Sequence, residues 1–162
     1  MFKRWRKRLG LGAFVVFVVI QLVPIKRDDP PVNPALALNA PPAVTAILRQ
    51  SCYDCHSDQT VWPWYAHVAP VSWFVTHHVN HARAKMDFSH WYAYSVSRQQ
   101  DYLDQIKDAV TYGWMPLSSY LWIHRDAVLS PAQADTVADW AGKLADSLDS
   151  SPPAPSAPKP SP

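Results

Sequence analysis

The sequence has little positive charge outside its first 27 residues, and it has no glutamate at all. Seven of its 15 Lys and Arg residues fall within those 27 positions. From Asp28 onward, 8 basic residues against 13 aspartates leave a net charge of −5. Binding to nucleic acid depends on Lys and Arg side chains that displace counterions from phosphates. We therefore expect no nucleic-acid partner.

Alternation of polar and apolar residues, the pattern typical of strands, is almost missing. A hydrophobic share of 48% nevertheless excludes a wholly disordered chain. Apolar residues recur at helical spacing between residues 41 and 149. Start signals predict helices that begin near Asn39–Pro42, Pro70, Ser97 and Ser130–Pro131, with long loops at 57–69 and 111–129. These patterns predict an all-α domain over residues 41–149.

Charged residues are also absent from Leu9–Ile25, a run of 17 residues. Roughly 17–25 apolar residues are needed to cross a bilayer as a helix. Because basic residues precede the run, the positive-inside rule keeps the N-terminus in the cytoplasm and exports the rest. A cleaved signal peptide is the alternative, but its nearest small-x-small site, Ala35–Ala37, lies well beyond the run. We predict an uncleaved transmembrane anchor within residues 1–25.

Proline marks the two segments that flank the predicted domain. Residues 26–40 are proline-rich with a charged start, and we interpret them as a linker that leaves the membrane. Residues 150–162 (SSPPAPSAPKPSP) offer almost nothing to bury, and we predict a disordered tail.

The only two cysteines lie in the motif Cys52-Tyr53-Asp54-Cys55-His56. This C-x-x-C-H pattern is the attachment motif of c-type haem: two thiols reach the two vinyl groups, and the histidine binds the iron. A disulfide across so short a loop would stabilise little and leave His56 unexplained. A thioredoxin-like pair expects βαβ surroundings, and a zinc site would need two further ligands, which histidines could supply. We favour one covalent haem c per chain.

The haem iron needs a sixth ligand or an open position, and methionine is common in cytochromes c. Met115 lies in Gly113-Trp114-Met115-Pro116, where glycine frees the loop and proline stiffens it. The alternative is that Met115 fills a gap in the core. Met86 has no such loop and is the weaker candidate. His78 is the second choice, which would make the iron bis-histidine and lower its potential.

Two further sets of side chains invite a role. His77 and His81 are spaced i, i+4, which can hold a metal on one helix face, although most such histidines are simply exposed or bonded in the core. Among the arginines of the domain, Arg83 is the best candidate to pair with a haem propionate.

Three stretches together resemble a known family. They are SCYDCHSDQTVWPWYAHVAPVSWFVTHHVNHAR from Ser51 to Arg83, Phe88-Ser89-x-Trp91, and Gly113-x-Met115-Pro116-Leu117. They resemble the CxxCH-containing haem-binding domain of bacterial membrane-anchored, exported proteins, over roughly Ala40 to Leu148. The resemblance implies a c-type haem on Cys52, Cys55 and His56 in a small, all-α, cytochrome c-like domain. It also places the protein at the bacterial inner membrane, with the haem domain on the periplasmic side.

The predicted function is electron transfer by a single membrane-tethered haem, with redox proteins and the bilayer as partners. Such a protein is an electron carrier rather than an enzyme. A haem-based sensor, or a ligand-binding or peroxidase-like module, is the alternative if the sixth ligand can be displaced. The coordination of the iron discriminates between these functions.

Overall fold

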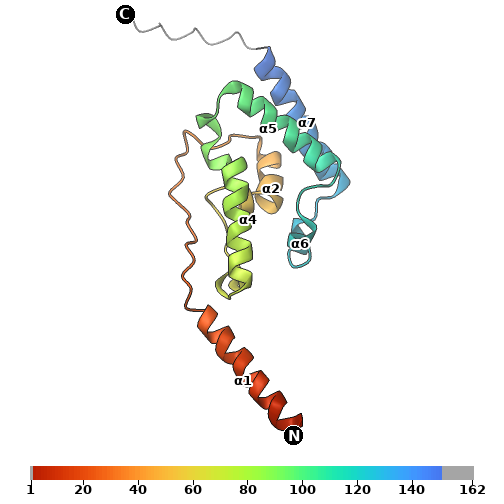
Figure 1. Ribbon diagram of the computed structural model, residues 1–162. Helices are drawn as coiled ribbons and strands as arrows, with labels where there is room; N and C mark the ends of the chain where they lie inside the picture. Colours follow the sequence, from red (N-terminus) through yellow and green to blue (C-terminus); the bar gives the residue numbers. More distant parts are fainter. Residues whose placement is uncertain (1, 151–162) are drawn as a thin grey trace, which may run out of the picture. The chain divides into compact units, whose positions relative to one another are not determined.

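The computed structural model describes residues 2–150, with side chains from Arg4 onward. The tail predicted at 150–162 therefore lies, after Ser150, outside the described residues. Helices account for the regular structure, and the described part of the chain contains no strand. This confirms the all-α prediction (Figure 1). The elements are α1 (Phe2–Ile20), α2 (Pro42–Ser51), α3 (Tyr53–His56), η1 (Trp64–His67), α4 (Val71–Lys85), η2 (Phe88–Ala93), α5 (Val96–Thr111), α6 (Ser118–Leu121), η3 (Arg125–Ala127) and α7 (Pro131–Asp149).

The described chain divides into two compact units. One comprises residues 2–38 and 53–90, and we name it the α4 unit; the other comprises residues 39–52 and 91–150, and we name it the α5–α7 unit.

The α5–α7 unit is built on two long helices that pack along each other (Figure 1). Leu103, Ile106 and Val110 form one buried stripe on α5, and Val137 and Ala141 form the stripe on α7. The i, i+3, i+7 and i, i+4 spacings place each set on one helix face. Helix α2 packs against α7 and buries its own apolar residues. The core of this unit therefore combines these aliphatic stripes, close to those expected from the sequence, with the buried rings of Trp91 and Tyr102.

The N-terminal caps of α5 and α7 test the helix starts that were predicted from the sequence. Ser130 accepts a hydrogen bond from the backbone N–H of Gln133, whose side chain accepts one from the N–H of Ser130. This capping box confirms the start predicted for α7. The predicted start of α5 at Ser97 is wrong by two residues. Ser95 is the cap, because its side chain accepts from the N–H of Arg98 and places Ser97 inside the helix.

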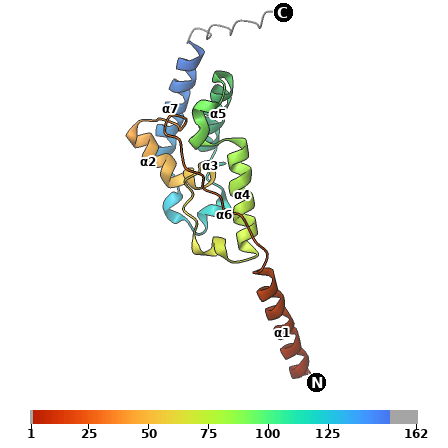
Figure 2. The same ribbon diagram turned by 90° about the vertical axis from the view of Figure 1, so that its left-hand side faces the viewer.

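The α4 unit is organised differently, around one helix and several short segments. Helix α3 and the 3-10 turn η1 both pack against α4, and Figure 2 shows η1 beside the start of α4. The start predicted at Pro70 is confirmed, since α4 begins at the next residue. The two segments predicted as loops contain short helices: 57–69 includes η1, and 111–129 includes α6 and η3.

The N-terminal helix differs from the predicted anchor. The expected helix through Ile25 is wrong at its C-terminal end, because α1 stops at Ile20. Pro24 supplies the physical reason: its ring has no N–H to donate, and it disfavours helical conformation at Val23. Among the residues that the structure describes, no helix combines the length and apolar character that crossing a membrane requires.

Residues 26–38 are not a detached linker. The guanidinium of Arg27 donates to the carbonyl of Ala66 at 3.0 Å, and the N–H of Leu38 donates to the carbonyl of Phe88 at 2.7 Å. Asp29 accepts a hydrogen bond from the indole N–H of Trp62 at 2.5 Å. The segment therefore runs along the α4 unit as a strap, which we call the 26–38 strap.

Candidate functional site

The C-x-x-C-H motif spans the end of α2 and the single turn of α3. Cys52 is the C-terminal cap of α2, with its N–H bonded to the carbonyl of Leu48 at 2.8 Å, and Cys55 lies in α3. Neither cysteine forms a disulfide, and both are of intermediate exposure. The structure therefore presents two cysteines outside any disulfide at the spacing that haem attachment requires.

Two hydroxyl groups stabilise the turn that carries Cys55. Ser57 donates to the carbonyl of Tyr53 at 2.8 Å, and Thr60 donates to the carbonyl of Asp54 at 2.7 Å. The last carbonyls of a helix have no partner within the helix, so these side chains supply it. The ring of Tyr53 also stacks on Phe88, with 5.4 Å between centroids. The sequence after the motif thus holds so short a helix in place.

Burial keeps the Cys55 thiol protonated. Removal from water and the negative charge of Asp54 raise its pKa to about 11, against the opposing charge of Arg83. The thiol is therefore neutral at neutral pH, and it is not poised as a thiolate nucleophile. This favours the haem interpretation over the redox-pair alternative.

The imidazole of His56 is oriented by a backbone carbonyl. Its Nδ1 lies 3.0 Å from the carbonyl oxygen of Met86. A carbonyl can only accept, so Nδ1 carries the proton and the lone pair is on Nε2. Burial lowers the pKa of His56, although the carbonyls of Met86 and Ala82 act in the opposite direction. A neutral imidazole, with one nitrogen fixed by a hydrogen bond, is the usual form of a metal-binding histidine.

Arg83 is a hub of polar contacts next to the motif. Its Nε donates to the carbonyl of Ser57 at 2.8 Å, and its Nη2 donates to Thr60 Oγ1 at 2.7 Å. Ser57 directly follows His56, and Thr60 holds the last turn of α3. Through these two bonds α4 fixes the chain on the C-terminal side of the motif.

The same guanidinium also binds the 26–38 strap. Nη2 contacts Asp29 Oδ1 at 2.6 Å, and Nη1 donates to the carbonyl of Asp28. Only 11% of the Arg83 side chain is exposed, against 32% for Asp29. Every nitrogen of Arg83 thus has a protein partner. The role predicted for it, pairing with a haem propionate, stays a prediction, and a propionate would have to compete with these contacts.

A second polar cluster lies beside Arg83. Asp58, Asp87 and His90 place one potential metal-ligating atom each within 4.8 Å of one another. His90 Nε2 lies 3.0 Å from Asp58 Oδ2, and Arg83 Nη1 lies 3.7 Å from Asp58 Oδ1. Burial and the charge of Asp58 raise the pKa of Asp87, while its bond from the N–H of Ser89 lowers it. The Arg83 guanidinium partly neutralises the negative charge of this cluster. The bonds of Asp58 to Ser89 and His90 hold η2 against the chain that follows the motif.

Met115 lies in the loop that follows α5 in the other unit. The chain leaves the helix through Gly113 at φ +67°, a left-handed conformation that glycine adopts without strain. The N–H groups of Trp114 and Met115 both donate to the carbonyl of Ala109, at 2.9 and 3.2 Å. These bonds hold the loop against the end of α5 and give Met115 a defined position.

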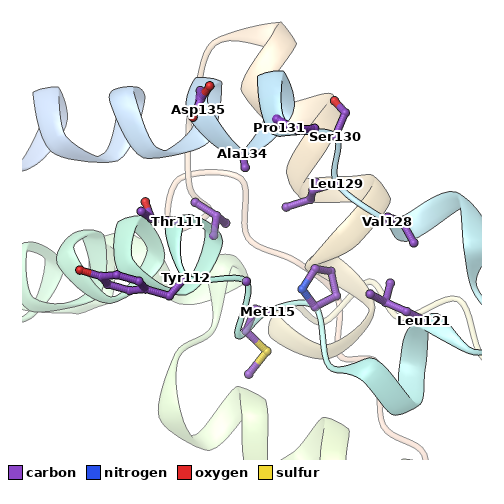
Figure 3. A pocket seen from close by; sticks show the side chains of 13 residues that line it. Thr111, Tyr112, Met115, Leu121, Val128, Leu129, Ser130, Pro131, Ala134 and Asp135 are labelled. Carbon is purple, nitrogen blue, oxygen red and sulfur yellow. The ribbon is translucent and has the colours of Figure 1, made fainter.

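The Met115 side chain is not part of the core of its unit. It is 38% exposed and lines a pocket formed by the end of α5, its own loop and the start of α7. Figure 3 shows its sulfur directed away from Leu129 and Ala134, which line the same pocket. Its neighbours Trp114 and Leu117 are 63% and 37% exposed. The alternative of a core-filling methionine therefore finds no support in this geometry.

The histidines of α4 present an aromatic surface. His78 Nδ1 lies 3.0 Å from the carbonyl of Phe74, and its ring packs on that of Phe74 with 4.1 Å between centroids. The rings of His77 and His81, both exposed, lie nearly parallel at 6.2 Å. His78 has a protonated Nδ1, as His56 has, and its role as second-choice ligand stays a prediction.

The donor set fits a haem of the c type. The motif offers two cysteine thiols and an imidazole whose Nδ1 is fixed by a carbonyl, and a separate loop offers a thioether among exposed apolar side chains. A haem is a large apolar ligand that needs such surfaces. What the fold and these residues define is a small all-α domain with a C-x-x-C-H motif whose histidine is oriented for a metal.

A family model for the haem-binding domain matches residues 15–143. The chain belongs to this family and is a haem-binding protein. Comparison with curated proteins finds no match, and comparison with solved structures finds none either.

Two parts of the site could not be found from the sequence. The carbonyl of Met86 that orients His56 is a backbone group, and no side-chain pattern marks it. The contacts of Arg83 with Asp29 join residues 54 positions apart, without any local signal. The hydroxyls of Ser57 and Thr60, which follow the motif directly, were the one visible clue to how α3 is held.

Proposed function

We propose that this protein is a mono-haem c-type cytochrome, tethered to the outer face of the cytoplasmic membrane, that transfers electrons between redox proteins. The observation that carries the proposal is His56, which follows two cysteines outside any disulfide and has Nδ1 bonded to the carbonyl of Met86, so that its lone pair is on Nε2. Membership of the haem-binding domain family supports the cofactor. When bound, the haem supplies an iron that alternates between the ferric and ferrous states.

The cysteines hold the cofactor in this proposal. Cys52 and Cys55 would hold the haem through thioether bonds to its two vinyl groups, and addition of a thiol to a vinyl group would need no oxidant. The raised pKa of Cys55 agrees with a thiol that stays protonated until attachment. His56 binds the iron through Nε2, while Met86 keeps the ring from turning.

Met115 is the proposed sixth ligand, with His78 as the second choice. A thioether ligand stabilises ferrous iron and raises the potential, which suits an electron carrier. The exposure of Met115 and its well-bonded loop support the assignment. A carrier of this kind needs only axial ligation, burial and an edge for electron transfer, so no enzymatic reaction is proposed.

Membrane attachment rests on the N-terminal region. All of the side chains described between Leu9 and Val19 are exposed, and the apolar run continues beyond α1 to Ile25. We propose that this run holds the chain to the bilayer. The basic residues before it place the N-terminus in the cytoplasm, and the haem domain then lies on the periplasmic side.

Absorption spectra of the oxidised and reduced holoprotein test the sixth ligand. The wild-type protein should be six-coordinate and low-spin, with a sulfur-to-iron band in the ferric state. Met115→Leu should lose that band, and the matched variant Met86→Leu should keep it. A high-spin wild-type spectrum that shifts with carbon monoxide would contradict the electron-carrier proposal and favour a sensor or peroxidase-like module.

A further inference from the structure

The end of the apolar N-terminal run is bonded directly to the α4 unit. The side-chain amide of Gln21 donates to the carbonyl of Ala69 at 3.1 Å and accepts from the N–H of Ala69 at 2.9 Å. This reciprocal pair fixes the chain between η1 and α4. The bond of Arg27 to Ala66 secures the same stretch a second time. Gln21 lies inside Leu9–Ile25. If that run enters the membrane, residues 66–69 are therefore held close to the membrane surface.

The surface at this junction is apolar and exposed. Trp64 is 79% exposed, Val61 75%, Phe74 55% and Val71 44%, and we call these four residues the 61–74 patch. Leu22, next to Gln21, is 78% exposed as well. Soluble domains rarely expose several large apolar side chains in one short stretch without a partner for them.

The charge pattern of this region points to the nature of the partner. No Asp, Glu, Lys or Arg occurs between Thr60 and Arg83, a span that includes η1 and nearly all of α4. Surfaces that bind another protein usually carry charged residues around the contact, and these increase the specificity and the rate of association. An uncharged surface rich in Trp and Phe is instead typical of the boundary between acyl chains and headgroups.

We infer that the 61–74 patch lies in the headgroup and acyl boundary of the membrane and holds the α4 unit against the bilayer. The inference rests on the proposed attachment through Leu9–Ile25. Two independent features support it: Gln21 holds Ala69 near the end of the run, and the segment around Ala69, which itself contains no Asp, Glu, Lys or Arg, exposes large apolar side chains. The α4 unit would then keep a constant orientation to the membrane, instead of swinging on a free linker.

Photo-crosslinking from the acyl chains tests this inference on the full holoprotein. The protein is reconstituted in vesicles of phosphatidylethanolamine and phosphatidylglycerol that contain a lipid with a diazirine near the headgroup end of one chain. Adducts are then located by mass spectrometry. Trp122 provides the internal comparison, because it is 72% exposed and belongs to the other unit.

We expect adducts at residues 9–25 and at residues 61–74, with several times fewer around Trp122. Trp64→Ser should reduce the adducts at 61–74, whereas Trp122→Ser should leave them unchanged. Labelling at 9–25 without labelling at 61–74 would overturn the inference and leave the anchor standing. Absence of labelling at both would overturn the proposed attachment as well, and equal labelling around Trp122 would show non-specific adsorption and overturn the patch alone.

Discussion

The two units of the molecule are stabilised by different interactions. The α5–α7 unit buries aliphatic stripes on two long helices together with Trp91 and Tyr102, and it has no charged residue among its buried side chains that the structure describes. The α4 unit buries Ser57, Asp58, Ser72, Thr76, Asp87 and Ser89, and Arg83 connects α3, α4 and the 26–38 strap. The stability of the unit that carries His56 thus depends on ion pairs and hydrogen bonds, which require specific distances and angles between their partners. The unit that carries Met115 depends on packing, which tolerates change better.

The largest effect on stability should come from Arg83→Met, which keeps the apolar stem and removes the guanidinium. Asp58 has 5% of its side chain exposed and would lose the guanidinium that lies 3.7 Å from its Oδ1. Breaking a buried ion pair costs about 3–5 kcal/mol, because the remaining charge is left without compensation. Urea unfolding should show this loss. Arg125→Met, at an exposed position, should change stability by less than about 0.5 kcal/mol, and an equal effect of both would contradict the role of Arg83.

Leu103→Ala tests the other unit. Leu103 is fully buried on α5, so the substitution removes apolar contacts and leaves a cavity. We expect a loss of about 2–5 kcal/mol in the free energy of unfolding. Ile123→Ala, at a side chain that is 64% exposed, is the control and should have little effect. A small loss at Leu103 would mean that the α5–α7 core is not the main source of stability there.

A smaller loss of stability is expected from breaking the contact between Asp29 of the 26–38 strap and Arg83 of α4. Asp29→Asn removes the charge that faces Arg83 and Trp62 but keeps an oxygen that can accept, and we expect a loss of about 1 kcal/mol, the usual net contribution of one hydrogen bond. Limited proteolysis should also cut residues 26–38 faster. Asp28→Asn is the matched control, because the Asp28 side chain is 58% exposed and Arg83 uses only its backbone carbonyl. Equal cleavage of both variants would contradict the strap.

The smallest effect concerns the pH dependence of stability. The pKa of Asp87 is raised in the folded protein, chiefly by burial. Between the ordinary pKa of 3.8 and the raised value, the folded state therefore binds more protons than the unfolded state. Stability must then fall as pH rises through that window. Asp87→Asn should flatten this part of the curve while Asp101→Asn, exposed on α5, should not; a steeper curve in Asp87→Asn would show the opposite sign.

The sequence was informative wherever the signal was local. The caps at Ser130 and the apolar stripe on α5 follow from neighbouring residues, and the motif at Cys52–His56 identifies its own chemistry. Ser95 and Ser97 both precede the apolar stripe of α5, so the sequence alone does not show which of them caps the helix. The hydrogen bond from the N–H of Arg98 identifies Ser95 as the cap. The Arg83 hub could not be predicted, since its partners lie 23 to 55 residues away. Long-range polar contacts leave no periodic pattern in a sequence.

The most direct test of the account is whether haem stays on the polypeptide after denaturation. The full chain is produced in a host that matures c-type haem, unfolded, and examined by mass spectrometry and by haem staining of a denaturing gel. We predict a chain mass that includes one haem in the wild-type protein and in Met86→Leu, and none in the double variant Cys52→Ser/Cys55→Ser. Complete release of haem from the wild-type protein would contradict covalent attachment and, with it, the proposed cytochrome.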